Sequence, residues 1–348
     1  MKNKKIWLFG LLAGLLAAAA TVLFLVPGSR PARPDLDLRL ALLRLLPAGS
    51  DLYAMADLVS LQASPVVRKL LTQAPRIPRE QEYEDFVRAT GFSYGRDLKR
   101  LALAKSGPDW VGAAQVALDR PQITAYIESL GAVTTKEMGQ TVFTFGQSRP
   151  FRLVLLDHDL VGFSVGGDMD SIRQVLQRHA GDIAASAAAE IEEAHDLDHI
   201  PAGSSVWAVG RLEKLLNADG EPPPLGSFEL GGRFLEGSKT LYLSVYPVDP
   251  VYPVDPPSEN SPAQLRFQLE AQCDSAASAE RIANSVQGIL ALLRFLPSGE
   301  SETPEKNFSS LLAGISVEHR QESVFLRWEW DESVLSFLEP NASPASSP

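Results

Sequence analysis

The longest uncharged stretch of the chain lies near its start and constrains the fold most. Residues 6–26 (IWLFGLLAGLLAAAATVLFLV) hold no charged side chain. At about 1.5 Å per residue, a helix of this length spans roughly the 30 Å hydrocarbon core of a bilayer. Lys2, Lys4 and Lys5 precede it, and excess lysine marks the cytoplasmic side. We therefore predict a cytoplasmic n-region at 1–5, a single-pass transmembrane anchor at 6–26, and the remainder outside the cytoplasm.

The alternative interpretation of this stretch is a cleaved signal peptide. The small residues Ala17–Ala20 offer a cleavage site. Apolar residues continue to Val26, however, which makes the run longer than the roughly 7–15 residues of a signal-peptide core. The length favours a retained anchor. Residues 27–34 contain three prolines and predict a stiff, non-helical spacer between the membrane and the folded part.

The charge balance disfavours polyanionic partners. The chain has 32 basic and 43 acidic residues, a net charge of −11. Five of the basic residues lie in the first 33 positions, so the remaining 27 basic and 43 acidic residues give −16. A protein surface with this negative charge repels nucleic acid and anionic lipid headgroups. Cys273 is the single cysteine, so no intramolecular disulfide forms and the core must stabilise the fold.

Two segments of the chain resemble each other. Residues 47–61 (PAGSDLYAMADLVSL) and 201–215 (PAGSSVWAVGRLEKL) are identical at seven of fifteen positions. Later elements recur in the same order: a strand-like run, an Asp-led helix, paired strands and a second Asp-led helix. Such recurrence indicates an internal repeat. We predict a first α+β repeat at 35–180 and a second at 181–338.

Antiparallel strand patterns interrupted by one or two helices are typical of an α+β fold. We expect each half to form a mostly antiparallel sheet with helices packed on one face. The alternation of Val324, Leu326, Trp328 and Trp330 with polar residues predicts a strand with one packed side. The segment 181–200, rich in alanine and glutamate, predicts a helical joining segment.

Two stretches have biased composition. The tandem VYPVDP repeat at 245–256 overlaps a Pro-rich stretch at 247–262. Because proline removes a ladder donor, this stretch predicts an extended loop rather than a central strand. The C-terminal residues 339–348 (EPNASPASSP) predict a disordered tail.

Gly162–Gly166 (GFSVG) matches the G-x-S-x-G pattern of the hydrolase nucleophile elbow. That elbow needs a helix starting at the serine, whereas here the predicted helix starts at Asp168. Ser164 also continues the strand alternation of its neighbours. An ordinary strand serine is the favoured interpretation, and a catalytic Ser164, served by a histidine such as His179 or His199, is the alternative.

His195 and His199 are four residues apart, which would place both imidazoles on one helical face and allow zinc binding. Neighbouring carboxylates could add ligands, but no glutamate follows the first histidine as general base. Pro201 disfavours a helix immediately before it. The favoured interpretation is therefore a solvated linker, with metal binding as the alternative.

The other polar candidates have structural explanations. Cys273 ends a predicted strand with no cation beside it to stabilise a thiolate, which favours a buried structural thiol. Asp119, Asp168, Asp274 and Asp331 each stand where a strand gives way to a helix. There a carboxylate can accept a helix N–H, for about 1 kcal/mol, so we predict that all four are helix caps.

The segment 45–61 (LLPAGSDLYAMADLVSL) follows one anchor helix and opens with Leu-Pro-Ala, a small residue and a strand with an aromatic. In this it resembles the opening of uncharacterised bacterial single-pass membrane-anchored envelope proteins of unknown function. The resemblance implies an envelope location. It brings no functional residues and no cofactor.

We expect a non-enzymatic binding or scaffolding module of the cell envelope, periplasmic in a Gram-negative cell. Its expected partner is another envelope protein or an apolar ligand, with no cofactor and no nucleic acid. The alternatives are a serine hydrolase that uses Ser164 and a metal-binding module at His195 and His199.

Overall fold

The computed structural model describes residues 36–64, 67–68, 81–217, 235–248, 264–295 and 314–330. The predicted n-region, anchor and spacer at 1–34, most of the Pro-rich stretch, the Asp331-led helix and the tail lie outside these residues. Within the described residues, no helix combines the length and hydropathy needed to span a bilayer.

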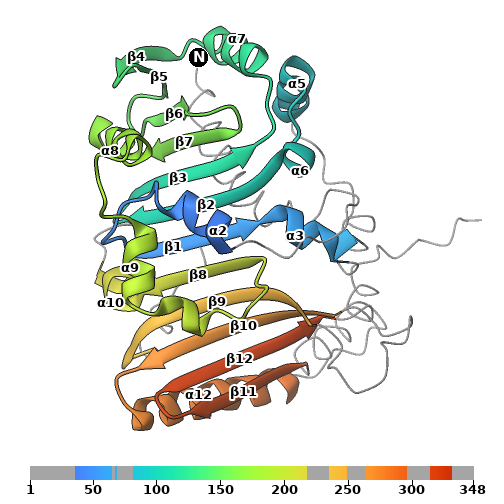
Figure 1. The fold of residues 1–348 in the computed structure, drawn as a ribbon. Coiled ribbons are helices and arrows are strands. Elements are labelled where there is room, and N and C mark those ends of the chain that lie inside the picture. Colours follow the sequence, from blue (N-terminus) through green and yellow to red (C-terminus); the bar gives the residue numbers. More distant parts are fainter. Residues whose placement is uncertain are drawn as a thin grey trace, which may run out of the picture.

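The described strands form one antiparallel sheet of 12 strands (Figure 1). Its spatial order is β11-β12-β10-β9-β8-β1-β2-β3-β7-β6-β5-β4. The strands are β1 (Leu52–Asp57), β2 (Leu98–Ser106), β3 (Asp109–Val116), β4 (Val133–Glu137), β5 (Gln140–Phe145), β6 (Phe151–Leu155), β7 (Leu160–Val165), β8 (Val206–Arg211), β9 (Ser238–Val248), β10 (Gln264–Cys273), β11 (Ile315–Arg320) and β12 (Ser323–Trp330).

The prediction of two related α+β halves, each a mostly antiparallel sheet, is wrong, because the described strands form one continuous sheet. The two similar segments supply β1 and β8, which are neighbours in the middle of the continuous sheet, with Ala54 opposite Ala208. Both faces of β1 are packed, since Tyr53 and Met55 lie on one face and Ala56 on the other. Because β1 is hydrogen-bonded to β2 on one side and to β8 on the other, it is an interior strand and not the edge of a separate sheet.

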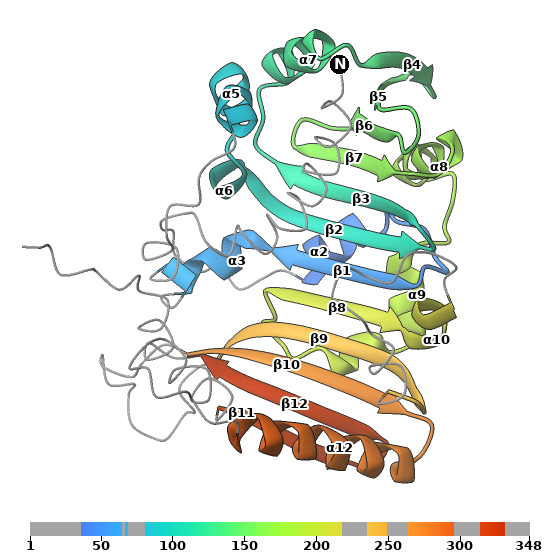
Figure 2. The same ribbon diagram turned by 180° about the vertical axis from the view of Figure 1, so that it is seen from behind.

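The prediction that helices cover only one face is also wrong. The front face carries Tyr53, Trp207 and Tyr242, and the back face carries Ala56, Val245 and Ala271. Helices α2 (Leu36–Leu43), α8 (Met169–Ala180) and α9 (Ala187–Glu193) lie over the front face (Figure 1). Helices α3 (Leu58–Ala63), α5 (Gln81–Thr90), α7 (Arg120–Ser129) and α12 (Ala276–Phe295) lie over the back face (Figure 2). The remaining short helices are α6 (Tyr94–Asp97), α10 (Leu212–Asn217) and the 3-10 helix η2 (Asp196–His199).

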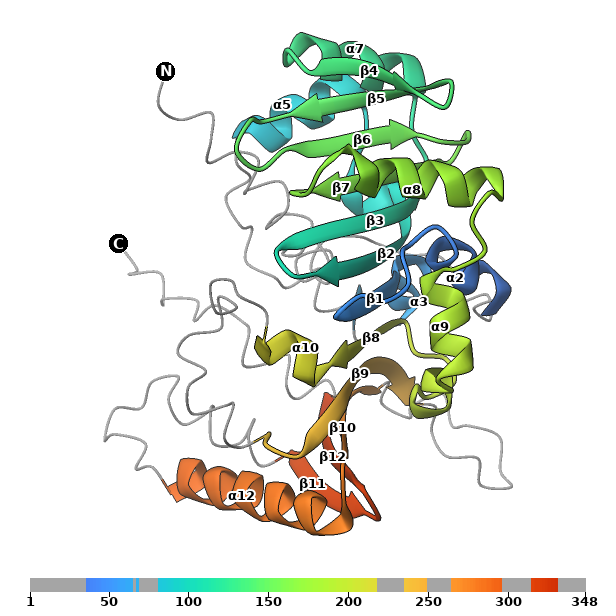
Figure 3. The ribbon, with the colours of Figure 1, turned by 90° about the vertical axis from the view of Figure 1, so that its left-hand side faces the viewer.

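The helices are distributed unevenly along the sheet. From β1 to β7, buried apolar side chains fill both sides, with Val154 and Val175 on the front and Phe163 and Leu101 on the back. At β10 and β12, apolar packing is on the back, where α12 places Ile282 against the strands. Seen edge-on, α8 and α9 lie on one side and α12 on the other (Figure 3). The front of β9, β10, β12 and β11 therefore has no described helix in front of it, apart from η2 at its inner margin.

Local structure explains which caps and turns form. Asp119 and Asp168 cap α7 and α8, as predicted, by accepting the N–H of Gln122 and of Asp170. At α12 the prediction is wrong, because Ser275 rather than Asp274 accepts the N–H of Ser278, at 3.2 Å. Asp274 instead accepts the Ser275 hydroxyl.

The Pro-rich stretch does not begin as a loop. Pro247 and Val248 belong to β9, with Pro247 opposite Leu265 of β10. Strand β8 begins at Val206, opposite Val245, so Pro247 lies beyond the start of β8 and has no β8 residue opposite it. A missing N–H is tolerated at such a position.

Candidate functional site

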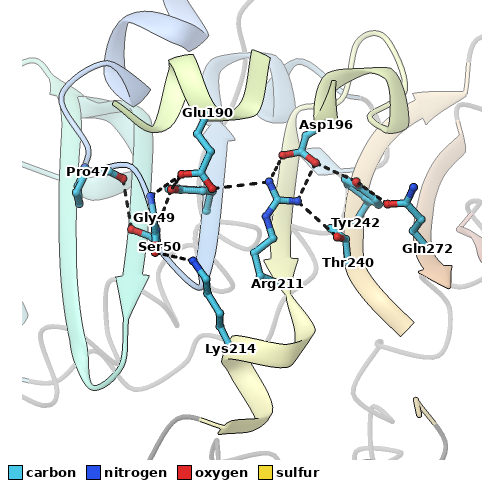
Figure 4. Close-up of polar contacts among 11 residues, drawn as sticks. Pro47, Gly49, Ser50, Glu190, Asp196, Arg211, Lys214, Thr240, Tyr242 and Gln272 are labelled. Atoms are coloured by element: carbon cyan, nitrogen blue, oxygen red, sulfur yellow. Dashed lines mark hydrogen bonds and ion pairs between the residues drawn. The ribbon is translucent and has the colours of Figure 1, made fainter. Parts of the chain in front are cut away.

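A cluster of polar side chains crosses the front face where β1, β8 and β9 meet α9 and η2 (Figure 4). Its centre is Arg211, at the end of β8. Arg211 donates from Nη1 to Oδ1 of Asp196 at 2.9 Å and from Nη2 to Oδ2 at 2.5 Å. Paired parallel bonds of this kind give a charge-assisted contact of defined geometry. The cluster therefore fixes η2 to the middle of the sheet.

The second anion of the cluster is Glu190 of α9. Its Oε2 accepts the hydroxyl of Tyr53 at 2.6 Å and the N–H of Gly49 at 2.5 Å, and its Oε1 lies 4.0 Å from Nη2 of Arg211. Gly49 has φ +79°, which glycine adopts readily, and its carbonyl accepts Lys214 Nζ at 2.9 Å. Both similar segments contribute, since Gly49 and Tyr53 come from the first and Arg211 and Lys214 from the second.

Tyr242 extends the cluster toward the outer strands. Its hydroxyl donates to Oδ1 of Asp196 at 2.9 Å. The ring stacks on the imidazole of His199, with centroids 4.4 Å apart and planes inclined by 10°. His199 Nδ1 lies 2.8 Å from Oε1 of Glu270, which also accepts the hydroxyl of Ser323 at 2.8 Å. Two buried carboxylates, Asp196 and Glu270, are thus both partnered.

The protonation of the cluster favours a structural role. Burial and hydrogen bonding to Glu190 raise the pKa of Tyr53 well above its usual value. Burial and the Asp196 charge do the same for the pKa of Tyr242. Burial opposes the charge of Arg211, but the contact with Asp196 outweighs it and raises the pKa of that guanidinium. Both tyrosines therefore act as hydrogen-bond donors near neutral pH, and Arg211 stays charged.

Beyond Tyr242 the front face continues as a polar surface, which we call the polar sheet face. It comprises Tyr246, Arg266, Gln268, Ser316, Glu318, Arg320, Phe325, Arg327 and Glu329.

Arginines link the strands of this polar sheet face. Arg327 Nε donates to Oε1 of Gln268 at 3.0 Å, and its guanidinium lies 5.1 Å from the Phe325 ring centroid. Arg266 bonds Glu329 and lies 5.9 Å from the ring centroid of Tyr246. The side chains of Arg320 and Glu329 are 65% and 45% exposed. The face is therefore cross-linked by its own side chains, with Arg320 and Glu329 exposed and Gln268 buried.

Ser164, the candidate nucleophile, lies inside strand β7 and is fully buried. Its Oγ has no hydrogen-bond partner in the described part of the chain. The following helix starts at Met169, and the sheet is antiparallel. His179 is paired with Asp157 at 3.5 Å and His199 with Glu270. Nothing described activates this hydroxyl.

The structure separates the two histidines of the metal hypothesis. His195 has φ +56° just before η2, and its side chain is 81% exposed. His199 instead points at the sheet and at Glu270. Among the described residues, no group of three or more histidine, cysteine or acidic side chains converges as metal ligands.

Cys273 ends strand β10, where it is buried against α12. Burial raises the pKa of its thiol, and the Ser238 hydroxyl only partly offsets this. The thiol therefore stays protonated near neutral pH, and a protonated thiol is a poor nucleophile.

Sequence reasoning missed the central cluster. Glu190, Asp196 and Arg211 carry no motif, and their contacts join residues 15 or more positions apart. One signal was present: the charged Arg211 stands in an otherwise apolar strand at a position occupied by Asp57 in the first segment. A charge at the end of a buried strand needs a partner.

No family model matches the chain, and no curated protein does. The chain is similar to two solved structures of the protein TP0453. Crystal form I matches with a TM-score of 0.40 at 10% sequence identity, and crystal form IV with 0.41 at 12%. Each of the two matches covers 86% of this chain and 96% of the TP0453 chain. At this level of similarity we transfer no function.

Proposed function

We propose that this chain is a non-enzymatic binding protein of the cell envelope, tethered through residues 6–26, whose polar sheet face binds another envelope protein. The observation that carries the proposal is the side-chain content of that face. Arginine and aromatic residues are enriched at protein interfaces, and here Tyr246, Phe325, Arg266 and Arg327 lie together on neighbouring strands.

The charge pattern of the face supports a protein partner. Three arginines alternate with Glu318 and Glu329, and several of them pair with one another. Alternating charges of both signs suit a partner that also carries both signs, because each pair can be exchanged for a cross-interface pair. An anionic polymer would meet the glutamates as well as the arginines.

The central cluster supports the same proposal by holding the face in place. Tyr242 and Glu270 belong to β9 and β10, the strands that also carry Tyr246, Arg266 and Gln268. Their bonds to Asp196 and His199 fix these strands against η2. A preorganised surface loses less conformational entropy on binding.

Site-specific photo-crosslinking in intact cells tests this proposal. A benzoylphenylalanine at Tyr246 or Phe325 probes the face, and one at Asn284, exposed on α12 on the opposite side, is the matched control. We expect a discrete protein adduct from the first two positions and not from the third. The adduct should weaken when Arg327→Glu reverses one charge. Equal adducts from all three positions, or none from the face, would contradict the proposal.

The tether is tested separately. A reporter fused after residue 348 should be active on the outer side of the membrane. Activity confined to the cytoplasm would overturn the envelope location, and mature chains that begin near Thr21 would remove the tether.

A further inference from the structure

Among the strands that the structure describes, the edge of the sheet furthest from the polar sheet face is β4, which is bonded to β5 alone. Such an edge presents unpaired backbone N–H and C=O groups, and these can template another strand. In Figure 1, β4 is the last strand of the sheet, with α7 beside its start. The residues from 81 to 217, which include the whole neighbourhood of β4 along the chain, are all described.

The hairpin between β4 and β5 fixes which backbone groups point outward. Met138 and Gly139 both have positive φ, +50° and +80°, in a two-residue turn between the opposed residues Glu137 and Gln140. The residues that flank such a turn exchange both backbone hydrogen bonds, and the pattern alternates along the strand. Thr134 and Lys136 therefore direct their N–H and C=O groups away from β5.

The two charged side chains of β4 each have a partner within the same molecule. Lys136 Nζ donates to the hydroxyl of Thr141 on the neighbouring strand at 2.6 Å. Glu137 pairs with Arg173 of α8, with Nε 3.2 Å from Oε2. Both charges are therefore bonded to groups of the same molecule, which weakens the repulsion that edge charges exert on an incoming strand.

Apolar side chains are exposed at both ends of this edge. Leu130 is 45% and Val133 63% exposed where the strand begins, and Met138 is 47% exposed where it ends. In an antiparallel copy centred on Thr135, Met138 of one molecule would stand opposite residue 132 of the other and diagonal to its Leu130, and the two-fold axis would repeat this contact. A strand of unrelated sequence has no such correspondence, so the pattern favours a second copy.

We propose that β4 pairs antiparallel with β4 of a second copy of this chain, with the two-fold axis at Thr135. In this register, Thr134 faces Lys136 of the other copy and Val133 faces its Glu137, so no like charges are opposed. The neighbouring register that centres on Lys136 would oppose two ammonium groups. An isologous contact of this kind closes on itself as a dimer. The inference does not depend on what the polar sheet face binds.

Cysteine crosslinking of the full-length protein in its membrane tests the register. In a background of Cys273→Ala, Thr135→Cys would place two thiols opposite each other in a non-hydrogen-bonded pair. The Cα atoms of such a pair are about 4.5 Å apart, within disulfide reach. Lys136→Cys is the matched control, since its copies would be diagonal neighbours about 7–8 Å apart. We expect the Thr135→Cys dimer to form at least about tenfold faster under mild oxidation.

Sedimentation of the detergent-solubilised chain provides the second readout. The unmodified protein should be a dimer, and Thr134→Pro should shift it to monomer because proline removes one outward N–H. Its melting temperature shows whether the variant still folds. A monomeric unmodified protein, or equal crosslinking at positions 135 and 136, would overturn the proposal. If Thr134→Pro does not fold, the comparison of the Thr135→Cys and Lys136→Cys variants still tests the proposed pairing.

Discussion

The buried carboxylate of Asp196 should be one of the most sensitive positions of the described fold. Its side chain is 1% exposed, and it accepts two hydrogen bonds from Arg211 and one from Tyr242. Asp196→Ala removes the anion and leaves a guanidinium that is 19% exposed. What remains for that cation is Glu190 at 4.0 Å and the hydroxyl of Thr240 at 3.5 Å.

The expected loss follows from leaving a buried charge without its partner. Breaking a buried ion pair by removing one member costs roughly 3–5 kcal/mol. Because Arg211 keeps partial solvent access and a second carboxylate, we expect the lower end, about 3 kcal/mol. For a folded unit of this size, 1 kcal/mol shifts the melting temperature by about 2–4 °C, so the variant should melt about 6–12 °C earlier.

Asp198, two residues later in the same 3-10 helix, provides the control. Its side chain is 79% exposed and lies 3.8 Å from His195, so Asp198→Ala should change the unfolding free energy by less than about 0.5 kcal/mol. Urea unfolding of both variants gives the comparison. Adding Arg211→Met to Asp196→Ala should recover part of the loss, because the stranded cation is removed. A loss below about 1 kcal/mol for Asp196→Ala would refute this reasoning.

Four further predictions concern packing, the candidate nucleophile, the thiol and pH. Gly112→Ala should destabilise by about 2 kcal/mol in urea unfolding, because the new Cβ would lie 2.1 Å from Cζ of Phe163. Ser164→Ala should keep or slightly raise stability, since it removes a buried hydroxyl without a partner; fluorophosphonate labelling at Ser164 would count against this. The Cys273 thiol should resist iodoacetamide at pH 8 until the protein is unfolded, because burial raises its pKa; fast native labelling would disagree. The raised pKa of Tyr242 means that its contribution to stability is complete below pH ~10 and is lost as pH rises further; Tyr242→Phe should flatten that loss in alkaline unfolding curves.

Features set by neighbouring residues could be predicted from the sequence. The alternation of Val324, Leu326, Trp328 and Trp330 does separate an apolar side of β12 from a polar side. Phe267 packs on the apolar side, with its ring centroid 4.7 Å from that of Trp330. The joining segment is partly helical, as α9 and η2 show. Both features depend on the spacing of residues within one strand or helix, which can be read from the sequence.

Features set by pairing between distant residues could not be predicted. The likeness of 47–61 and 201–215 was visible, but which strand lies beside which depends on contacts across the whole sheet. The periodicity of apolar residues predicts which side of a strand is packed, but it does not predict which other strands pair with it. The similar segments pair with each other, so the residues of the two expected halves form one continuous sheet.

The candidate residues illustrate the same limit. His199 was singled out for its spacing from His195, whereas its contact is Glu270, 71 positions away. Arg211 and Asp196 are 15 positions apart and belong to different elements. Polar contacts of this kind become visible only when the sheet order is known.

The most direct test of the proposed binding face is the accessibility of one cysteine in living cells. Glu329→Cys, in a Cys273→Ala background, places a thiol on the polar sheet face, and Asn284→Cys places one on the exposed side of α12. A membrane-impermeant maleimide added to cells with a permeable outer layer should label position 284 readily and position 329 slowly. Both should react equally in the purified protein. Equal labelling of the two positions in cells, or labelling of neither until the inner membrane is opened, would contradict a partner-covered face outside the cytoplasm.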